Sequence, residues 1–159
     1  MPTVHLLHGL PGTGKTTFAH KLAAELNAVR LTHDEWMTIL YGTNPPAEHF
    51  ADYHDRVLSL IWKMAAEFIS HDIDVILDHG FWTRKSRDAA RAQTQAIGAT
   101  PKFYRLVCPD PVADARVLER SKNPRPGVLL IDAAALELFR SRYEPLGEDE
   151  LHIIVNTHE

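Results

Sequence analysis

Short apolar runs alternate along the chain with longer stretches in which apolar residues recur every three or four positions. The runs predict β-strands at residues 4–7, 28–31, 73–78, 102–107 and 151–155. The periodic stretches predict helices at residues 18–26, 36–41, 46–70, 83–97, 110–120 and 133–143. Strands that alternate with helices form a parallel sheet covered on both faces. The pattern therefore predicts a single α/β domain over residues 1–159.

Several residues mark where the predicted helices begin. Residues 46–70 carry the longest periodic stretch and predict a helix of about 24 residues. Thr83 and Asp132 can each accept a hydrogen bond at a helix N-terminus. Asp110 can cap the next helix, because Pro111 suits its first position.

The turn after the first predicted strand carries the pattern glycine, four residues, glycine-lysine-threonine. It consists of Gly9, Leu10, Pro11, Gly12, Thr13, Gly14, Lys15 and Thr16, followed by Thr17. In such a turn the glycines let the backbone approach an anion, and the helix N-terminus adds a partial positive charge. We expect Lys15 to contact the β- and γ-phosphates of a nucleotide and Thr16 to bind Mg²⁺. The alternative is that these glycines form a turn by chance, without binding phosphate. The predicted strand before the turn and the predicted helix after it favour the phosphate-binding interpretation.

Charge and composition narrow the class of protein. The formal net charge of −4 at pH 7 makes a nucleic-acid partner or an anionic membrane surface unexpected, although a local basic patch stays open. Cys108 is the single cysteine, so an internal disulfide is excluded and a reducing compartment is expected. No apolar run approaches roughly 18 residues. We therefore expect a cytoplasmic protein without a membrane segment, as a monomer or homodimer.

Two acidic residues follow predicted strands, at the edge where parallel α/β sheets bind their ligands. Asp34 comes shortly after the second predicted strand, where it can act as a general base for an attacking hydroxyl or merely cap a helix. Asp78 ends the third predicted strand, where it can hold Mg²⁺ on the metal side, contact the substrate or cap a turn. We favour the functional interpretation of both carboxylates.

Two arginines predict a short lid around residues 116–130. Arg116 and Arg120 lie one helical turn apart, next to the proline- and glycine-rich residues 121–127. Such a lid would bring guanidinium groups to a transferring phosphate and exclude water. The alternative is a solvated arginine pair linked to nearby acids. Arg125, within the lid, is a weaker candidate.

Further residues at the same edge are candidate contacts for a phosphate acceptor. They are Arg84, Arg87, His33, His79, Trp36 and Trp82. The two arginines could equally form an exposed basic helix start, and the two histidines are as consistent with structural roles. The histidines show no zinc-binding spacing. Trp62, by contrast, belongs to the longest helix and is expected to pack in the core.

The sequence resembles the small P-loop kinases of the AAA_33-type ATP-binding family, whose relatives include polynucleotide kinase, chloramphenicol phosphotransferase, gluconate kinase and zeta toxins. The resemblance rests on residues 9–17, 31–35, 75–87 and 115–120. It implies a three-layer P-loop NTPase fold with a five-stranded parallel sheet of order 2-3-1-4-5. It also implies that Asp34 activates the acceptor hydroxyl, that Arg116 and Arg120 act from the lid on bound ATP, and that Asn156 lies near the adenine. Asn156 stands where the family usually has aspartate.

These observations predict an ATP-dependent phosphotransferase that uses Mg²⁺ and transfers the γ-phosphate to a hydroxyl of a small molecule. Lys15, Asp34, Arg116 and Arg120 are its predicted catalytic residues. Two alternatives stay open. A 5′-hydroxyl polynucleotide kinase would need a basic channel, which only the arginines and lysine of residues 84–91 could supply. A nucleotide-dependent ATPase switch would phosphorylate no acceptor.

Overall fold

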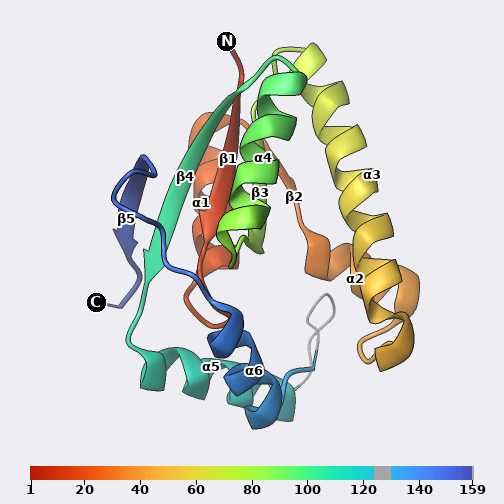
Figure 1. Ribbon diagram of the computed structural model, residues 1–159, viewed down its shortest axis with the longest axis vertical. Helices are drawn as coiled ribbons and strands as arrows, with labels where there is room; N and C mark the ends of the chain where they lie inside the picture. Colours follow the sequence, from red (N-terminus) through yellow and green to blue (C-terminus); the bar gives the residue numbers. More distant parts are fainter. Residues whose placement is uncertain (124–129, 159) are drawn as a thin grey trace.

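The computed structural model describes residues 1–123 and 130–158, which form a parallel β-sheet between two layers of helices (Figure 1). Its strands are β1 (Thr3–His8), β2 (Val29–Leu31), β3 (Val75–Gly80), β4 (Thr100–Val107) and β5 (His152–Asn156). Every neighbouring pair is parallel, and the order across the sheet is β2-β3-β1-β4-β5. The predicted five-stranded P-loop NTPase fold, with its order 2-3-1-4-5, is confirmed.

Helices follow the strands much as the periodicity predicts. They are α1 (Lys15–Leu26), α2 (His33–Tyr41), α3 (Phe50–Ser70), α4 (Arg84–Ala96), α5 (Asp110–Lys122) and α6 (Ala133–Arg142). The predicted long helix is divided, because a 3₁₀ turn covers Ala47–His49 and α3 then continues for 21 residues. Tight turns of this kind are frequent where α-helices begin.

The capping residues are confirmed in two cases and differ in one. The hydroxyl of Thr83 accepts a hydrogen bond from the Ser86 N–H at the start of α4. Asp132 caps α6 in the same way. Asp110 instead lies inside the first turn of α5, because Pro109 occupies the N-cap position.

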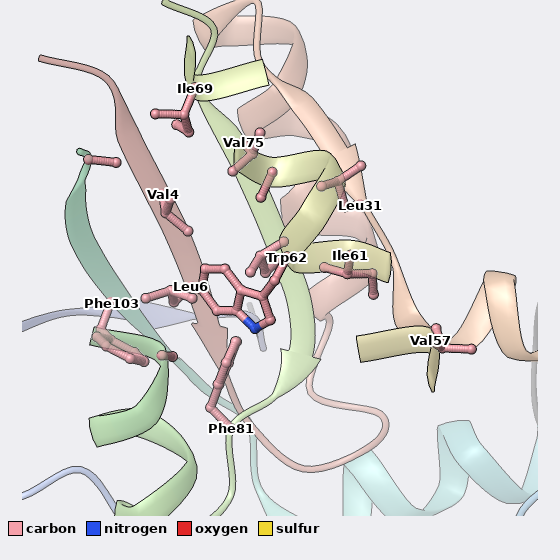
Figure 2. Packing of buried hydrophobic residues seen from close by; sticks show 14 of the residues in the cluster. Val4, Leu6, Leu31, Val57, Ile61, Trp62, Ile69, Val75, Phe81 and Phe103 are labelled. Carbon is pink, nitrogen blue, oxygen red and sulfur yellow. The ribbon is translucent and has the colours of Figure 1, made fainter. Parts of the chain in front are cut away.

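The two faces of the sheet are covered by different helices, because side chains alternate along each strand. Leu6 of β1 points to the face covered by α3 and α4, where it belongs to a cluster with Trp62 and Phe103 (Figure 2). Leu7 points to the opposite face, where Leu22 of α1 covers it. Trp62 is 9% exposed, so its predicted packing role is confirmed.

Two helices lie beyond the carboxyl ends of the strands. Figure 1 shows α5 and α6 side by side at this end, next to the loop that joins β1 to α1. Ligands of parallel sheets bind at this end, so the fold places the candidate residues together. In the part of the chain that the structure describes, no helix combines the length and apolar character needed to cross a membrane.

Candidate functional site

The glycine-rich turn joins the end of β1 to the first residue of α1, as its pattern predicts. Gly12 and Gly14 have positive φ angles of 83° and 91°. A Cβ atom on Gly12 would lie 2.2 Å from the Ala113 carbonyl oxygen, so α5 packs directly on the turn. Glycine is therefore required at this position both by the backbone angle and by the close approach of α5.

The N-terminus of α1 fits an anion. Gly14 occupies its N-cap position and supplies no side-chain acceptor, and the helical hydrogen bonds begin with the Phe18 N–H bonding to the Gly14 carbonyl at 3.0 Å. The N–H groups of residues 15–17 precede that bond, so the helix offers them no carbonyl. The exposed Thr16 hydroxyl lies on this first turn. The turn can thus bind phosphate oxygens, with Thr16 beside them as a ligand suited to Mg²⁺.

The Lys15 side chain lies over the same turn. Its Nζ donates hydrogen bonds to the Gly9 carbonyl at 2.8 Å and to the Leu10 carbonyl at 2.9 Å. Burial lowers the pKa of Lys15 to about 8, against the opposing charges of Asp34 and Asp78. Because both carboxylates act on this ammonium group, the structure brings the three predicted residues into one electrostatic environment.

Two aromatic residues near the turn, Trp82 and His8, form hydrogen bonds that the sequence pattern does not predict. The Trp82 Nε1–H donates a hydrogen bond to the Gly9 carbonyl at 3.1 Å. The indole ring packs against Phe139 of α6, with 4.7 Å between the ring centroids. His8 is fully buried and lies between the Phe81 carbonyl and the Tyr143 hydroxyl, each at 2.9 Å. Trp82, predicted to contact the acceptor, therefore supports the phosphate loop in this structure.

Asp34 lies in the first turn of α2, one residue beyond the buried His33. Thr32 occupies the N-cap position, so the interpretation of Asp34 as that helix's cap is not supported. Its side chain is 60% exposed, and Oδ1 lies 3.6 Å from His33 Nδ1. Partial loss of water raises the pKa of Asp34, but His33 and then Lys15 outweigh it, so the net pKa is lowered. An ionised, accessible carboxylate thus lies near the phosphate loop.

Asp78 is buried within β3, which continues to Gly80 rather than ending at the acid. Its Oδ2 accepts a hydrogen bond at 3.2 Å from Arg30, and Arg30 also donates to Glu35 at 2.6 Å. Burial raises the pKa of Asp78, opposed mainly by Arg30. One carboxylate oxygen of Asp78 is therefore already paired with a cation. A role of Asp78 in holding Mg²⁺ or in contacting the substrate stays a prediction. In the described ranges no group of three or more acids, histidines or cysteines could hold a metal ion.

Arg87 has a structural role, which contradicts the predicted acceptor contact. The side chain is 1% exposed, and its guanidinium forms a bidentate pair with Glu150 at 2.9 and 3.0 Å. It also donates to the carbonyls of Phe81, Glu144 and Pro145. Arginine is buried in this way only when every donor finds a partner. Arg87 thus fastens the segment after α6 to the end of β3.

The Arg84 side chain also contacts the segment that follows α6. Its guanidinium donates to both carboxylate oxygens of Asp149, at 3.1 and 2.8 Å, and it lies 3.4 Å from Glu150. The pair is exposed to solvent. These contacts explain the basic start of α4 without an acceptor, so the predicted contact of Arg84 is not supported by its position.

Replacing Arg87 with methionine is expected to lower the free energy of unfolding by about 3–5 kcal/mol, because Glu150 and several carbonyls would lose their buried partner. Urea denaturation followed by circular dichroism would measure the change. The matched control is Arg84→Ala, which removes an exposed ion pair on the same helix and should change the midpoint little. Equal, small effects of both substitutions would contradict the structural role of Arg87.

The two lid arginines come from a helix that packs on the phosphate loop. Arg116 donates to the Gly12 carbonyl at 3.2 Å and to the Thr157 carbonyl at 3.5 Å. Arg120 Nε donates to the Arg116 carbonyl at 3.4 Å, and its charge acts on the pKa of Lys15. Residues 116–122 of the predicted lid are thus the end of α5. Arg125 lies outside the described residues.

The segment after β5 closes the opposite side of the loop. Thr157 Oγ1 donates to the Thr13 carbonyl at 2.6 Å, and the Thr157 N–H donates to the Val107 carbonyl at 3.0 Å. Asn156, the last residue of β5, is exposed, and its Oδ1 accepts a hydrogen bond from the His158 N–H. Asn156 therefore lies at the loop's edge, where its adenine contact stays a prediction, and Thr157 is a support that sequence reasoning missed.

Trp36 lies away from these groups, in a shallow apolar groove between α2 and α3. The groove is lined by Trp36, Ile39, Leu40, Leu60 and Met64. The groove is apolar, and the predicted acceptor contact of Trp36 stays a prediction. His33 and His79, in contrast, lie beside Asp34, and their charges act on its pKa.

Comparisons with known families and structures agree with this arrangement. The AAA_33 family model, described as an AAA domain, matches residues 4–146. A protein from Chloroflexus aurantiacus, described as a candidate kinase, is similar with a TM-score of 0.77 and 25% identity, over 98% of this chain and 88% of that chain. A search of curated proteins finds no significant sequence match.

Two more distant structures show the same fold. A gluconokinase from Sinorhizobium meliloti has a TM-score of 0.67 at 15% identity, covering 99% of this chain and 84% of its own. Kti12 from Chaetomium thermophilum, solved in complex with ADP-AlF3, has a TM-score of 0.74 at 18% identity, covering 97% of this chain and 89% of its own. With the family match over most of its length and the phosphate loop in place, the chain belongs to the AAA_33 family of small P-loop kinases.

Proposed function

We propose that the protein is a kinase that transfers the γ-phosphate of ATP to a hydroxyl of a small-molecule acceptor. The observation that carries the proposal is the position of Asp34. Its accessible carboxylate lies at the carboxyl end of the sheet, and its charge acts on Lys15 of the phosphate loop. A base next to a phosphate-binding loop is the arrangement that phosphoryl transfer to a hydroxyl requires.

In the proposed reaction the acceptor oxygen attacks the γ-phosphorus in line with the leaving group. The bond from that phosphorus to the β–γ bridging oxygen breaks, and ADP leaves. The acceptor proton passes to the Asp34 carboxylate, which later releases it to water. Lys15 and the loop N–H groups bind the β- and γ-phosphate oxygens, and the guanidinium groups of Arg116 and Arg120 offset the charge that develops during transfer.

Mg²⁺ would be held by the Thr16 hydroxyl together with phosphate oxygens, and it would neutralise part of the triphosphate charge. Asp78 lies within electrostatic reach of Lys15, which is consistent with a role on the metal side through water. Arg30 and the Thr32 hydroxyl both hydrogen-bond this carboxylate, so such a contact would have to share it with them.

A polynucleotide acceptor is disfavoured by the ion pairs of α4. The predicted basic channel needs the arginines of residues 84–91 to face a phosphodiester backbone. Arg84, Arg87 and Arg91 are instead engaged by Asp149, Glu150 and Asp88. Nucleic acid would have to displace these acids before it could bind here.

The proposed function is tested by ADP release from Mg-ATP, with hydroxyl compounds added singly and the phosphorylated product identified by ³¹P NMR. A kinase shows turnover that an acceptor stimulates and a new phosphoester signal. Slow hydrolysis to inorganic phosphate, unchanged by every acceptor, would favour the ATPase switch.

Nucleotide affinity is expected to fall as the pH rises above about 8. Lys15 has a lowered pKa of about 8 in the free protein, so it loses its proton above that pH, whereas bound phosphates favour the protonated form. Nucleotide affinity is therefore highest and nearly constant well below pH 8, and above pH 8 it decreases by up to about tenfold per pH unit. Between pH 7 and pH 9.5 we expect a total decrease of roughly thirtyfold. Calorimetric titration with a non-hydrolysable ATP analogue measures this.

Lys15→Arg is the matched control for this titration, because a guanidinium stays protonated over the whole range. Its affinity for the analogue, whatever its absolute value, should not follow the same curve. A wild-type affinity that is constant from pH 7 to 9.5 would contradict the lowered pKa or the contact between Lys15 and phosphate.

A further inference from the structure

Three histidines from different elements gather around Asp34. His33 begins α2, His54 lies in the first half of α3, and His79 is in β3. The ring centroids of His33 and His54 are 4.3 Å apart, and those of His33 and His79 are 5.9 Å apart. His54 lies among the periodic positions of a long amphipathic helix, so the sequence pattern gives no sign that it belongs to a site. We call His33, His54 and His79 the histidine cluster.

Most of the cluster is uncharged at neutral pH. Burial, followed by the charges of His33 and His54, lowers the pKa of His79 to about 3. Burial likewise lowers the pKa of His54, followed by the charge of His33. A neutral imidazole carries one N–H donor and one acceptor nitrogen. These two rings can therefore exchange hydrogen bonds with hydroxyl groups, but they do not attract an anion.

Two ring nitrogens of the cluster lack partners. Among the described residues, His33 Nε2 and His79 Nδ1 are buried and form no hydrogen bond. His33 is 3% exposed, so its unpaired nitrogen is held inside the protein, next to the catalytic candidate Asp34. A buried nitrogen without a partner costs roughly 1–3 kcal/mol. Because both atoms are closed to solvent, the half-buried rings of His54 and His79 are the parts of the cluster that a bound compound can reach.

Fixed charge around the cluster is mainly negative. Asp34 is accessible and ionised, and Asp78 and Glu35 lie nearby on Arg30. The Arg30 side chain is 12% exposed, and its guanidinium forms ion pairs with the carboxylates of Asp78 and Glu35. Within residues 1–123 and 130–158, an acceptor carrying phosphate or carboxylate would meet Asp34 without a guanidinium fork of the kind that normally binds such groups.

The other cations that the structure describes at the site lie on its nucleotide side. Lys15 is bonded to carbonyls of the phosphate loop, and Arg116 joins the Gly12 and Thr157 carbonyls. The arginines of α4 that could have faced the acceptor, Arg84 and Arg87, are paired with Asp149 and Glu150. Among the residues that the structure describes, the positive charge in the site is thus placed to bind ATP rather than the acceptor.

We propose that the acceptor is a hydroxyl compound without anionic groups, neutral or cationic at pH 7, and that it binds against the histidine cluster with the reacting hydroxyl at Asp34. This inference rests on the proposed kinase function. It excludes sugar acids, nucleotides and the 5′ ends of polynucleotides as the preferred acceptors. Neutral imidazoles bind the hydroxyl groups, and Asp34 repels an additional negative charge.

The test separates acceptors by charge before the reaction. A deproteinised bacterial small-molecule extract is passed over a strong anion exchanger at pH 7, giving an unbound pool of neutral and cationic compounds and an eluted pool of anions. Each pool is incubated with the protein and γ-³²P-ATP, and label in new phosphoesters is counted. Lys15→Ala serves as the blank. We expect transfer into the unbound pool at least tenfold above transfer into the eluted pool.

The outcomes distinguish this inference from the proposed function. Transfer mainly into the eluted, anionic pool would overturn the inference and leave the kinase function standing. Transfer into neither pool above the Lys15→Ala blank would count against both. Transfer into the unbound pool supports both.

Substitution of His54 tests where the acceptor binds. His54→Leu removes both ring nitrogens, whereas His54→Gln keeps a donor and an acceptor. With dilutions of the active unbound pool, His54→Leu should raise the apparent KM for acceptor at least tenfold more than the KM for ATP, and His54→Gln should restore most of the loss. The control is His71→Leu, at the exposed far end of α3. Equal kinetics for His54→Leu and His71→Leu would overturn the assigned position.

Discussion

Replacing Lys15 with alanine is expected to lower phosphoryl transfer from ATP roughly a thousandfold, because in the proposed reaction its ammonium group binds the phosphate oxygens on which charge develops. Among the described residues, the hydrogen-bond partners of Nζ are the Gly9 and Leu10 carbonyls. Phosphate oxygens would replace these neutral acceptors with charged ones, which make stronger hydrogen bonds. The rate of ADP formation under saturating acceptor measures the loss.

The same substitution should leave the fold intact. Burial lowers the pKa of Lys15 to about 8, below its ordinary 10.5, so the folded protein disfavours the charged form. At pH 7 the ammonium is therefore held at a cost in folding free energy, which alanine removes. We expect a melting temperature within about 3 °C of the wild type, or above it.

A matched control is available on the same helix. Lys21 is exposed on α1, and its only ion pair is a 4.0 Å contact with Glu25 within the described residues. Lys21→Ala should therefore retain full transfer. Loss of transfer in Lys15→Ala together with loss of the folded circular dichroism signal would show a structural role for Lys15 instead of a catalytic one.

The fold could be predicted from the sequence because its signals are local. Alternation of Leu6 and Leu7 assigns the two faces of β1, and the spacing of Phe18 and Leu22 assigns the inner side of α1. The phosphate loop is similarly local, since its glycines, Lys15 and Thr16 are consecutive in the chain. Such features need no knowledge of distant partners.

Interactions between distant segments could not be predicted in this way. Arg87 follows three other basic or polar residues at the start of α4 and resembles an exposed position, but its partner Glu150 lies 63 residues further along the chain. Trp82 is likewise bonded to Gly9, 73 residues away. The position of Arg30 is one signal of a distant contact that the sequence does contain. An arginine between two apolar strand residues needs a buried partner, although the sequence does not say which residue that is.

Replacing Asp34 with asparagine is expected to lower phosphoryl transfer at least about a hundredfold while nucleotide affinity stays close to that of the wild type. Asparagine keeps the shape of the side chain but cannot accept the acceptor proton. Because the carboxylate is 60% exposed, the substitution should change stability little. Single-turnover transfer and equilibrium binding of an ATP analogue measure the two effects separately.

The control for this substitution is Asp52→Asn, which neutralises an exposed carboxylate paired with Arg56 on α3. It changes the net charge equally but lies outside the site, so its transfer rate should match the wild type. Transfer by Asp34→Asn at the wild-type rate would show that Asp34 is not the base. A parallel loss of nucleotide affinity would instead assign Asp34 to the ATP complex, because its charge acts on Lys15. Only loss of transfer with binding retained places the proton on Asp34.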